Sequence, residues 1–256
     1  MEKASFVVSK VLTFLKDNTK PNTNLVDLNA QAEDLIIKLG ATSFNKGYQP
    51  TWSKTPFPTA VCMCINNEVA HSFPYREVNG KKIPKILQEG DIVSYDVGVK
   101  INGLCGDAAL TVSVGKIDSR AERLLYYAKN TLYEGIKMVK AGVTLEEVSA
   151  SMEKYAMLRG FVINERYTGH GISKEMHEEP TIAHVYIPNN EWNTYILKEG
   201  QMICLEPMLT YEDKEGFLQE DGWTSLTQDG RNSAFYEHMI KVTKEGSEIL
   251  TTHIEA

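Results

Sequence analysis

The spacing of apolar residues predicts four helices that fall into two pairs. In each of these stretches apolar residues recur every three or four positions, as they do on one face of a helix. The predicted helices lie near 2–18, 24–39, 119–140 and 144–159. Gly40 and Gly160 follow the second and the fourth, and glycine commonly ends a helix.

Apolar runs bounded by turn residues predict the strands. In the first half they predict a strand at 60–65 and a hairpin of strands 91–99 and 105–114, whose turn contains Asn102-Gly103. In the second half the predicted strands lie near 161–167, 180–187, 201–210, 223–227 and 234–243.

Two similar stretches each end on a carboxylate. Residues 87–96 and 197–206 both contain a Glu-Gly turn and then an apolar run, which ends on Asp96 in the first and Glu206 in the second. Burying an unpaired acid costs several kcal/mol. One such acid could be a paired core carboxylate, but two at matched positions predict a shared site. A cation would hold clustered carboxylates in their ionised form.

The similarity between the halves extends to their helices. Residues 24–33 and 144–153 both open with a helix-capping residue and an acid three positions later. Each half therefore predicts two helices followed by strands. We expect an α/β (α+β) domain over 1–256, with pseudo-twofold lobes at roughly 1–118 and 119–256 and a site where the lobes meet.

The predicted hairpin brings two acids together. A two-residue turn at Asn102-Gly103 places Gly98 opposite Asp107, so that Asp96 lies one diagonal step from Asp107 on the same face. A turn one residue earlier would place the two acids directly opposite each other. The alternative is a solvated sheet face, but the flanking Val, Ile, Cys and Leu residues favour burial. Buried like charges repel unless something neutralises them.

Composition excludes several classes of protein. Apolar residues make up 42% of the 256, enough for a core, and the net charge of −7 disfavours nucleic acid as a partner. No apolar run approaches the ~18 residues that a membrane span needs. The four cysteines, Cys62, Cys64, Cys105 and Cys204, form no CxxC pair, which favours a reduced, cytoplasmic compartment.

Three histidines and one more acid are candidate site residues. His71 follows a predicted strand, His170 lies between two glycines, and His177 precedes two glutamates. Taken singly, each is more often a surface or core histidine than a ligand. Glu237 is an acid inside an apolar strand, so its neighbour His238 points to the other face. We expect the remaining histidines, His184, His238 and His253, to be structural.

These residues resemble, in order and spacing, those of a type I methionine aminopeptidase, and the similarity covers 1–256. The matching stretches are Asp96, Asp107 eleven positions later, Gly169-His170-Gly171, His177-Glu178-Glu179-Pro180, Leu205-Glu206-Pro207 and Phe235-Tyr236-Glu237-His238. The resemblance implies the pita-bread fold, in which helices cover the outer face of a curved antiparallel sheet.

The resemblance also implies the roles of individual residues. It implies two divalent metal ions, Co, Mn, Fe or Zn, rather than a thiolate-selected metal. The implied ligands are Asp96, Asp107, His170, Glu206 and Glu237. Glu206 would also move a proton, while His177 would contact the scissile carbonyl and His71 the amide nitrogen. The implied walls of the methionine pocket are Phe57, Cys62, Met176 and Trp223.

The implied activity is removal of the initiator methionine from nascent proteins and peptides, with a small second residue preferred. A metal-bridging water or hydroxide would attack the first peptide bond. The enzyme would act as a cytoplasmic monomer, with the ribosome as a further candidate partner and no membrane or direct nucleic-acid partner.

Two alternatives and several departures from the family pattern stay open. The 35 residues between His170 and Glu206 leave no room for the insertion of type II enzymes. A prolidase would share the ligands but cut before proline, and a non-enzymatic binding module would have lost ligands. Ala70, Ser72 and the bulky loop at 171–176 leave the shape of the pocket and its second-residue preference undetermined.

Overall fold

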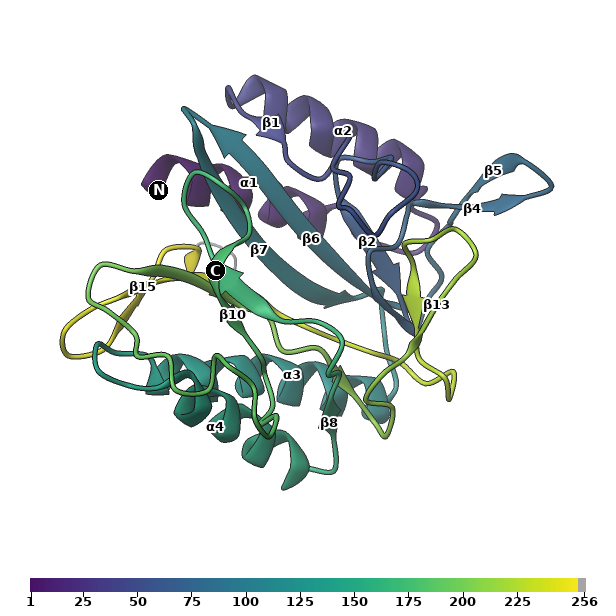
Figure 1. Cartoon of the computed structure of the whole chain (residues 1–256). Helices are drawn as coiled ribbons and strands as arrows, with labels where there is room; N and C mark the ends of the chain where they lie inside the picture. Colours follow the sequence, from purple (N-terminus) through teal and green to yellow (C-terminus); the bar gives the residue numbers. More distant parts are fainter. Residues whose placement is uncertain (253–256) are drawn as a thin grey trace.

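Two pairs of helices enclose antiparallel sheets in the computed structural model, which describes residues 1–252 (Figure 1). Helices α1 and α2 lie on one side of the strands, and α3 and α4 lie on the opposite side (Figure 1). Their bounds are Glu2–Asp17, Leu25–Lys38, Ser119–Met138 and Leu145–Met157, which confirms the four predicted helices. Within the described chain, no helix is long and apolar enough to span a membrane.

Side chains cap three of these helices. The Asn24 side chain accepts a hydrogen bond from the Val26 N–H at the start of α2, and Asp118 does the same for Ala121 at the start of α3. At the start of α4, Thr144 and Glu147 form a complete capping box. Each cap satisfies a backbone donor that the helix itself leaves free, which stabilises the helix by about 1 kcal/mol.

The long hairpin is the centre of the first sheet. Strand β6 (Ile92–Ile101) pairs with β7 (Leu104–Ser113), and on its other edge with β1 (Thr42–Ser43) and β2 (Cys62–Ile65). Gly98 pairs with Asp107, and Asp96 with Ala109, which confirms the register predicted from a two-residue turn.

The second sheet has the strand order β10-β9-β11-β15-β16. These strands span Gly169–Gly171 (β9), Glu178–Ile182 (β10), Met202–Leu205 (β11), His238–Val242 (β15) and Ser247–Ile249 (β16). An isolated bridge between Ala109 and Glu237 joins β7 to the residue just before β15. The Glu237 N–H donates to the Ala109 carbonyl at 2.9 Å, so the two sheets are hydrogen-bonded to each other.

The remaining strands are short. They are β3 (Glu68–Ala70), β4 (Tyr75–Val78), β5 (Lys81–Pro84), β8 (Val162–Ile163), β12 (Leu209–Thr210), β13 (Phe217–Leu218) and β14 (Ser225–Leu226). The hairpin of β4 and β5 projects from the molecule (Figure 1). It was not expected, although Asn79-Gly80 is the same hairpin signal as Asn102-Gly103.

Several predicted strands are shorter than expected. The run predicted at 201–210 is two strands, because Pro207 has no N–H and cannot continue a ladder. Of the runs predicted at 161–167 and 234–243, only 162–163 and 238–242 form strands. The apolar residues beyond these bounds lie in irregular backbone instead, and a short apolar run looks the same in sequence whether or not it forms a strand.

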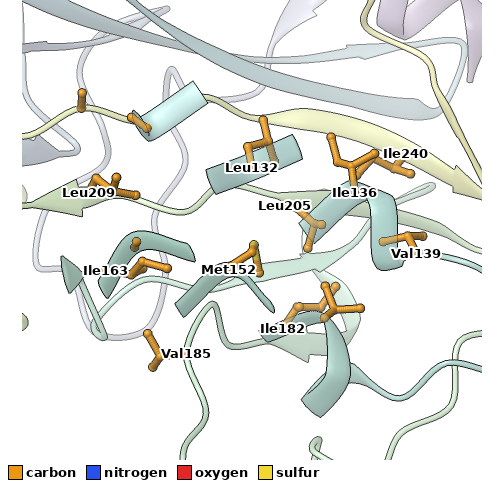
Figure 2. Packing of buried hydrophobic residues seen from close by; sticks show 14 of the residues in the cluster. Leu132, Ile136, Val139, Met152, Ile163, Ile182, Val185, Leu205, Leu209 and Ile240 are labelled. Carbon is orange, nitrogen blue, oxygen red and sulfur yellow. The ribbon is translucent and has the colours of Figure 1, made fainter. Parts of the chain in front are cut away.

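Each helix pair has its own apolar core. The core beneath α3 and α4 brings Leu132 and Ile136 of α3 and Met152 of α4 toward Leu205 of β11 and Ile240 of β15 (Figure 2). A separate core lies between α1, α2 and the β6–β7 hairpin. The two sheets are therefore supported from opposite sides, each by its own helix pair.

Replacing Gly106 with valine is expected to loosen α1 from β7. A Cβ atom at this position would lie 2.8 Å from both the carbonyl carbon and the Cβ of Ala4, closer than real contacts allow. Overpacking of this kind costs about 1–3 kcal/mol, which urea unfolding would measure as a lower midpoint. Gly246→Ala is the matched control, because nothing lies within 4 Å of its added Cβ. Equal midpoints for the two variants would contradict this close packing.

Candidate metal centre

The structure brings the five predicted ligand residues together at one cavity. Asp96 lies on β6, Asp107 on β7 and His170 on β9, while Glu206 directly follows β11 and Glu237 directly precedes β15. All five line the same cavity of about 600 Å³. Strands from both halves of the chain therefore contribute to the site.

Strand register explains why the acids converge. Asp96 pairs with Ala109 across the hairpin, and Ala109 in turn bridges to Glu237, so these residues form one row across the two sheets. Asp107 precedes Ala109 by two positions, so its side chain lies on the same face as that of Ala109. In the second sheet His170 pairs with Cys204, two positions before Glu206.

The ligand atoms lie at distances that a small ion can bridge. His170 Nε2 is 3.8 Å from both Asp107 Oδ2 and Glu206 Oε1. Carboxylate oxygens of Asp96, Asp107 and Glu237 lie within 4.8 Å of one another. His170 Nδ1 donates to the Gly171 carbonyl at 3.0 Å, which leaves the Nε2 lone pair directed at the acids.

Burial disfavours the ionised form of these four acids. It raises the pKa of Asp96 to about 7, and it raises the pKa of Asp107, Glu206 and Glu237 well above the usual range, with further increases from the neighbouring acids. In the described part of the chain, the buried oxygens Asp107 Oδ1 and Glu237 Oε1 have no hydrogen-bond partner. Four crowded carboxylates with orphaned oxygens, beside an imidazole lone pair, fit divalent cations.

Two further histidines face the same cavity. His71 has a left-handed backbone (φ 55°) and its ring lies 5.2 Å from that of Tyr167, centroid to centroid. The ring of His177 is 4.6 Å from that of His170, and its Nδ1 is 3.4 Å from the Tyr48 hydroxyl. Burial lowers the pKa of all three histidines, to about 4 for His71 and His170, so each is neutral at pH 7.

A buried ion pair holds the turn that carries His71. Lys85 Nζ donates to both carboxylate oxygens of Glu68, at 2.6 and 2.8 Å, and to the Ser72 hydroxyl at 2.8 Å. This contact gives the buried Ser72 hydroxyl a hydrogen-bond partner. The ammonium group therefore fixes the residues on both sides of the strained His71 backbone.

The predicted pocket residues Phe57, Cys62, Met176 and Trp223 all line the cavity. The structure adds lining residues that sequence analysis did not identify: Phe44, Asn45, Tyr48, Trp52, Arg166, Tyr167, Thr168 and Leu218. Half of these lie in the irregular segment between β1 and β2, where no periodic pattern could assign them to a site. Trp223 is fixed by its indole N–H, which donates to the Thr55 carbonyl at 3.0 Å.

His184, which we expected to be structural, contacts the backbone of two ligand strands. Its Nε2 accepts hydrogen bonds from the Gly169 and Glu206 N–H groups, both at 3.1 Å. Burial lowers its pKa to about 3, so the ring stays neutral and Nε2 keeps its lone pair. A Cβ at Gly169 would collide with the Cys204 carbonyl, which explains the glycine before His170. By contrast, His238 hydrogen-bonds Tyr133 and Thr251 away from the cavity, and His253 lies outside the described residues.

Stability of the metal-free protein is expected to fall between about pH 7.5 and 8.5. Above about pH 7.5 histidine is almost entirely neutral in both the folded and the unfolded chain, but the clustered acids bind more protons when folded, because their pKa values are raised. The free energy of unfolding should drop by about 1 kcal/mol or more per pH unit, measured by urea unfolding in a chelator. Excess Mn²⁺ should abolish the drop. Stability that rises with pH in the chelator would contradict the raised pKa values.

Replacing His184 with leucine is expected to cost about 2–5 kcal/mol, because the Gly169 and Glu206 N–H groups would both lose their acceptor inside the protein. The matched control is His184→Gln, whose side-chain oxygen can accept from both donors. Thermal unfolding should place the glutamine variant between the leucine variant and the original chain. Equal stability of the two variants would show that the acceptor is unimportant.

Comparison with known proteins agrees with this geometry. The sequence model of Metallopeptidase family M24 matches residues 1–244 of this chain. The methionine aminopeptidase of Aquifex aeolicus is 36% identical over 255 residues, which cover 98% of this chain and 94% of that protein. The methionine aminopeptidase structure from Thermotoga maritima has a TM-score of 0.86 and 34% identity, covering 98% of this chain and 94% of that one.

More distant relatives share the fold alone. The Xaa-Pro dipeptidase structure from Bacillus anthracis has a TM-score of 0.72 at 22% identity, and this chain covers 59% of its length. The similarity to the Thermotoga maritima structure confirms the expected pita-bread fold. The chain belongs to metallopeptidase family M24 and, within it, to the methionine aminopeptidases.

Proposed function

We propose that this chain is a type I methionine aminopeptidase that removes the N-terminal methionine from proteins and peptides, with a small second residue preferred. The observation that carries the proposal is the convergence of four acids, two of them buried and two partly buried, with His170 beside an apolar, aromatic wall in one cavity. The names of the two more similar proteins supply the substrate, because the proteins from Aquifex aeolicus and Thermotoga maritima are both methionine aminopeptidases.

The five ligands would hold two divalent cations. Asp96, Asp107 and Glu237 offer an all-oxygen group, and His170 and Glu206 extend it on the other side. When bound, the cations supply Lewis acidity and lower the pKa of water toward 7. This donor set accepts Co, Mn, Fe or Zn.

The other polar side chains of the cavity would handle the peptide bond. Glu206 is the proposed proton carrier, because its carboxylate lies at the cavity surface beside His170. The neutral ring of His71 would accept a hydrogen bond from the scissile N–H, and the neutral ring of His177 would donate one to the carbonyl oxygen of the same bond. The Tyr48 hydroxyl next to His177 Nδ1 would orient the second of these rings.

The aromatic wall would select methionine. Phe57, Cys62, Met176 and Trp223 are buried and apolar or polarizable, which suits a thioether side chain. Trp52 stacks at 6.5 Å from His71, centroid to centroid, and would narrow the space beyond the scissile bond. A narrow space on that side accounts for a small second residue.

The proposal extends to the organisation of the protein. A single catalytic domain over 1–256, with lobes at roughly 1–118 and 119–256, is supported by the bridge between Ala109 and Glu237, which joins the two sheets. We further propose that it acts in the cytoplasm as a monomer on nascent chains, with the ribosome as a partner.

Peptide hydrolysis tests the activity against the prolidase alternative. With added Mn²⁺, the protein is expected to release methionine from Met-Ala-Ser and to leave Ala-Pro intact. Cleavage of Ala-Pro alone would replace the proposal with the prolidase function.

Asp107→Asn is expected to lower methionine release by about 100-fold or more, since it removes one charge from a ligand whose oxygens face the centre. Asp34→Asn, an exposed position on α2, is the matched control and should keep full activity. Circular dichroism would establish that both variants are folded. Equal release by the two variants would reject the metal-dependent mechanism.

A further inference from the structure

A thiol lies among the ligands of the metal centre. Donor atoms of His170, Cys204 and Glu237 lie within 4.8 Å of one another, and all three residues are buried. This group shares Glu237 with the all-oxygen group of Asp96 and Asp107. No local pattern in the sequence indicates this group, because Cys204 occupies an apolar position in a strand.

Strand geometry directs Cys204 to the ligand face. Strand β11 lies between β9 and β15, and Cys204 pairs with His170 on one side and Met239 on the other. Side chains two positions apart on a strand point the same way, so Cys204 and Glu206 share a face. Met239, which pairs with Cys204, and Glu237 are also two positions apart, so the Glu237 side chain lies on the same face as well. The thiol is therefore fixed behind the carboxylates by the sheet itself.

All three donors have a lone pair to offer. His170 Nδ1 donates to the Gly171 carbonyl, which leaves Nε2 as the accepting atom. Glu237 Oε1 is buried and has no hydrogen-bond partner in the described part of the chain. A thiol that coordinates a metal loses its proton outright, so the cation itself would bring Cys204 into its binding form.

The distances suit a small tetrahedral cation after a modest adjustment. With Zn–S near 2.3 Å and Zn–N or Zn–O near 2.0–2.2 Å, donor atoms around zinc lie about 3.5 Å apart. If the Cys204 and Glu237 side chains rotate so that their donor atoms shift by about 1 Å, the group closes to that size. One sulfur, one nitrogen and one oxygen form a softer set than carboxylates alone, which favours Zn²⁺ or Cd²⁺ over Mn²⁺.

The other cysteines lack such neighbours among residues 1–252. Cys62 and Cys64 lie with their sulfurs 3.6 Å apart on β2, and Cys105 donates to the Lys174 carbonyl. Within this region Cys204 is the cysteine whose sulfur lies within 4.8 Å of a potential ligand atom of both a histidine and a carboxylate. Cys105 therefore serves as a buried control for Cys204.

We infer that His170, Cys204 and Glu237 form a binding site for a thiophilic divalent cation, Zn²⁺ or Cd²⁺. The site overlaps the proposed catalytic centre, so a cation held by Cys204 would draw His170 and Glu237 away from it and inhibit the enzyme. Only this inhibition rests on the proposed function. The sulfur ligation rests on the geometry alone.

Titration of the metal-free protein with Cd²⁺ tests the site directly. The original chain and Cys105→Ser should develop the ultraviolet charge-transfer absorption of a cadmium–thiolate bond, at one thiolate per cation. Cys204→Ser should lack this absorption and bind Cd²⁺ on the order of 10–100-fold more weakly, while its Mn²⁺ affinity changes less than threefold. Cys204→Ala is the second variant if the serine variant does not fold.

Two results would overturn the inference. One is absence of the absorption in the original chain, and the other is its persistence in the folded Cys204 variants. X-ray absorption of the zinc-loaded protein should likewise find a sulfur neighbour near 2.3 Å, as zinc–thiolate bonds require. Methionine release is measured separately with Mn²⁺, so a protein that shows the absorption but no release would keep the site and lose the proposed function.

Discussion

The structure depends on a single electrostatic constraint, which is that four carboxylates lie together inside the protein. The loss of hydration raises all four pKa values, and repulsion from neighbouring acids raises those of Asp107, Glu206 and Glu237 further. Two of the carboxylate oxygens lack any partner among residues 1–252. Buried charges of one sign are tolerated when a cation lies between them. The folded chain is therefore arranged around positive charge that it does not itself provide.

The backbone, rather than the side chains, sets this constraint. The bridge between Ala109 and Glu237 ties the two sheets together at the row that also contains Asp96. His184 accepts from the N–H groups of Gly169 and Glu206 and so fixes the backbone beside His170 and at Glu206. The helix pairs support the sheets from opposite sides, each with its own apolar core (Figure 1). The acids cannot separate without breaking sheet hydrogen bonds, and for this reason cations, not movement, are the expected means of relieving their repulsion.

Much of this arrangement could be predicted from the sequence, since it follows from local rules. The helices follow from apolar spacing, and the register of Asp96 and Asp107 follows from the turn at Asn102-Gly103. The ligand set came from a resemblance to a family, because nothing local in the sequence relates His170 to Asp107. The roles of His184 and Cys204 could not be predicted, because their contacts arise only when separate strands pair. The places of Tyr48 and Trp52 in the cavity wall could not be predicted, because irregular segments have no repeating apolar pattern.

The central claim is that the five side chains surround a pair of cations, and anomalous diffraction from crystals soaked in Mn²⁺ tests it most directly. The account predicts two peaks at the manganese edge, a few ångströms apart as in two-metal sites, with each of the five side chains within bonding distance of at least one peak. Crystals with no peak among Asp96, Asp107, His170, Glu206 and Glu237, and with these acids still clustered, would contradict it.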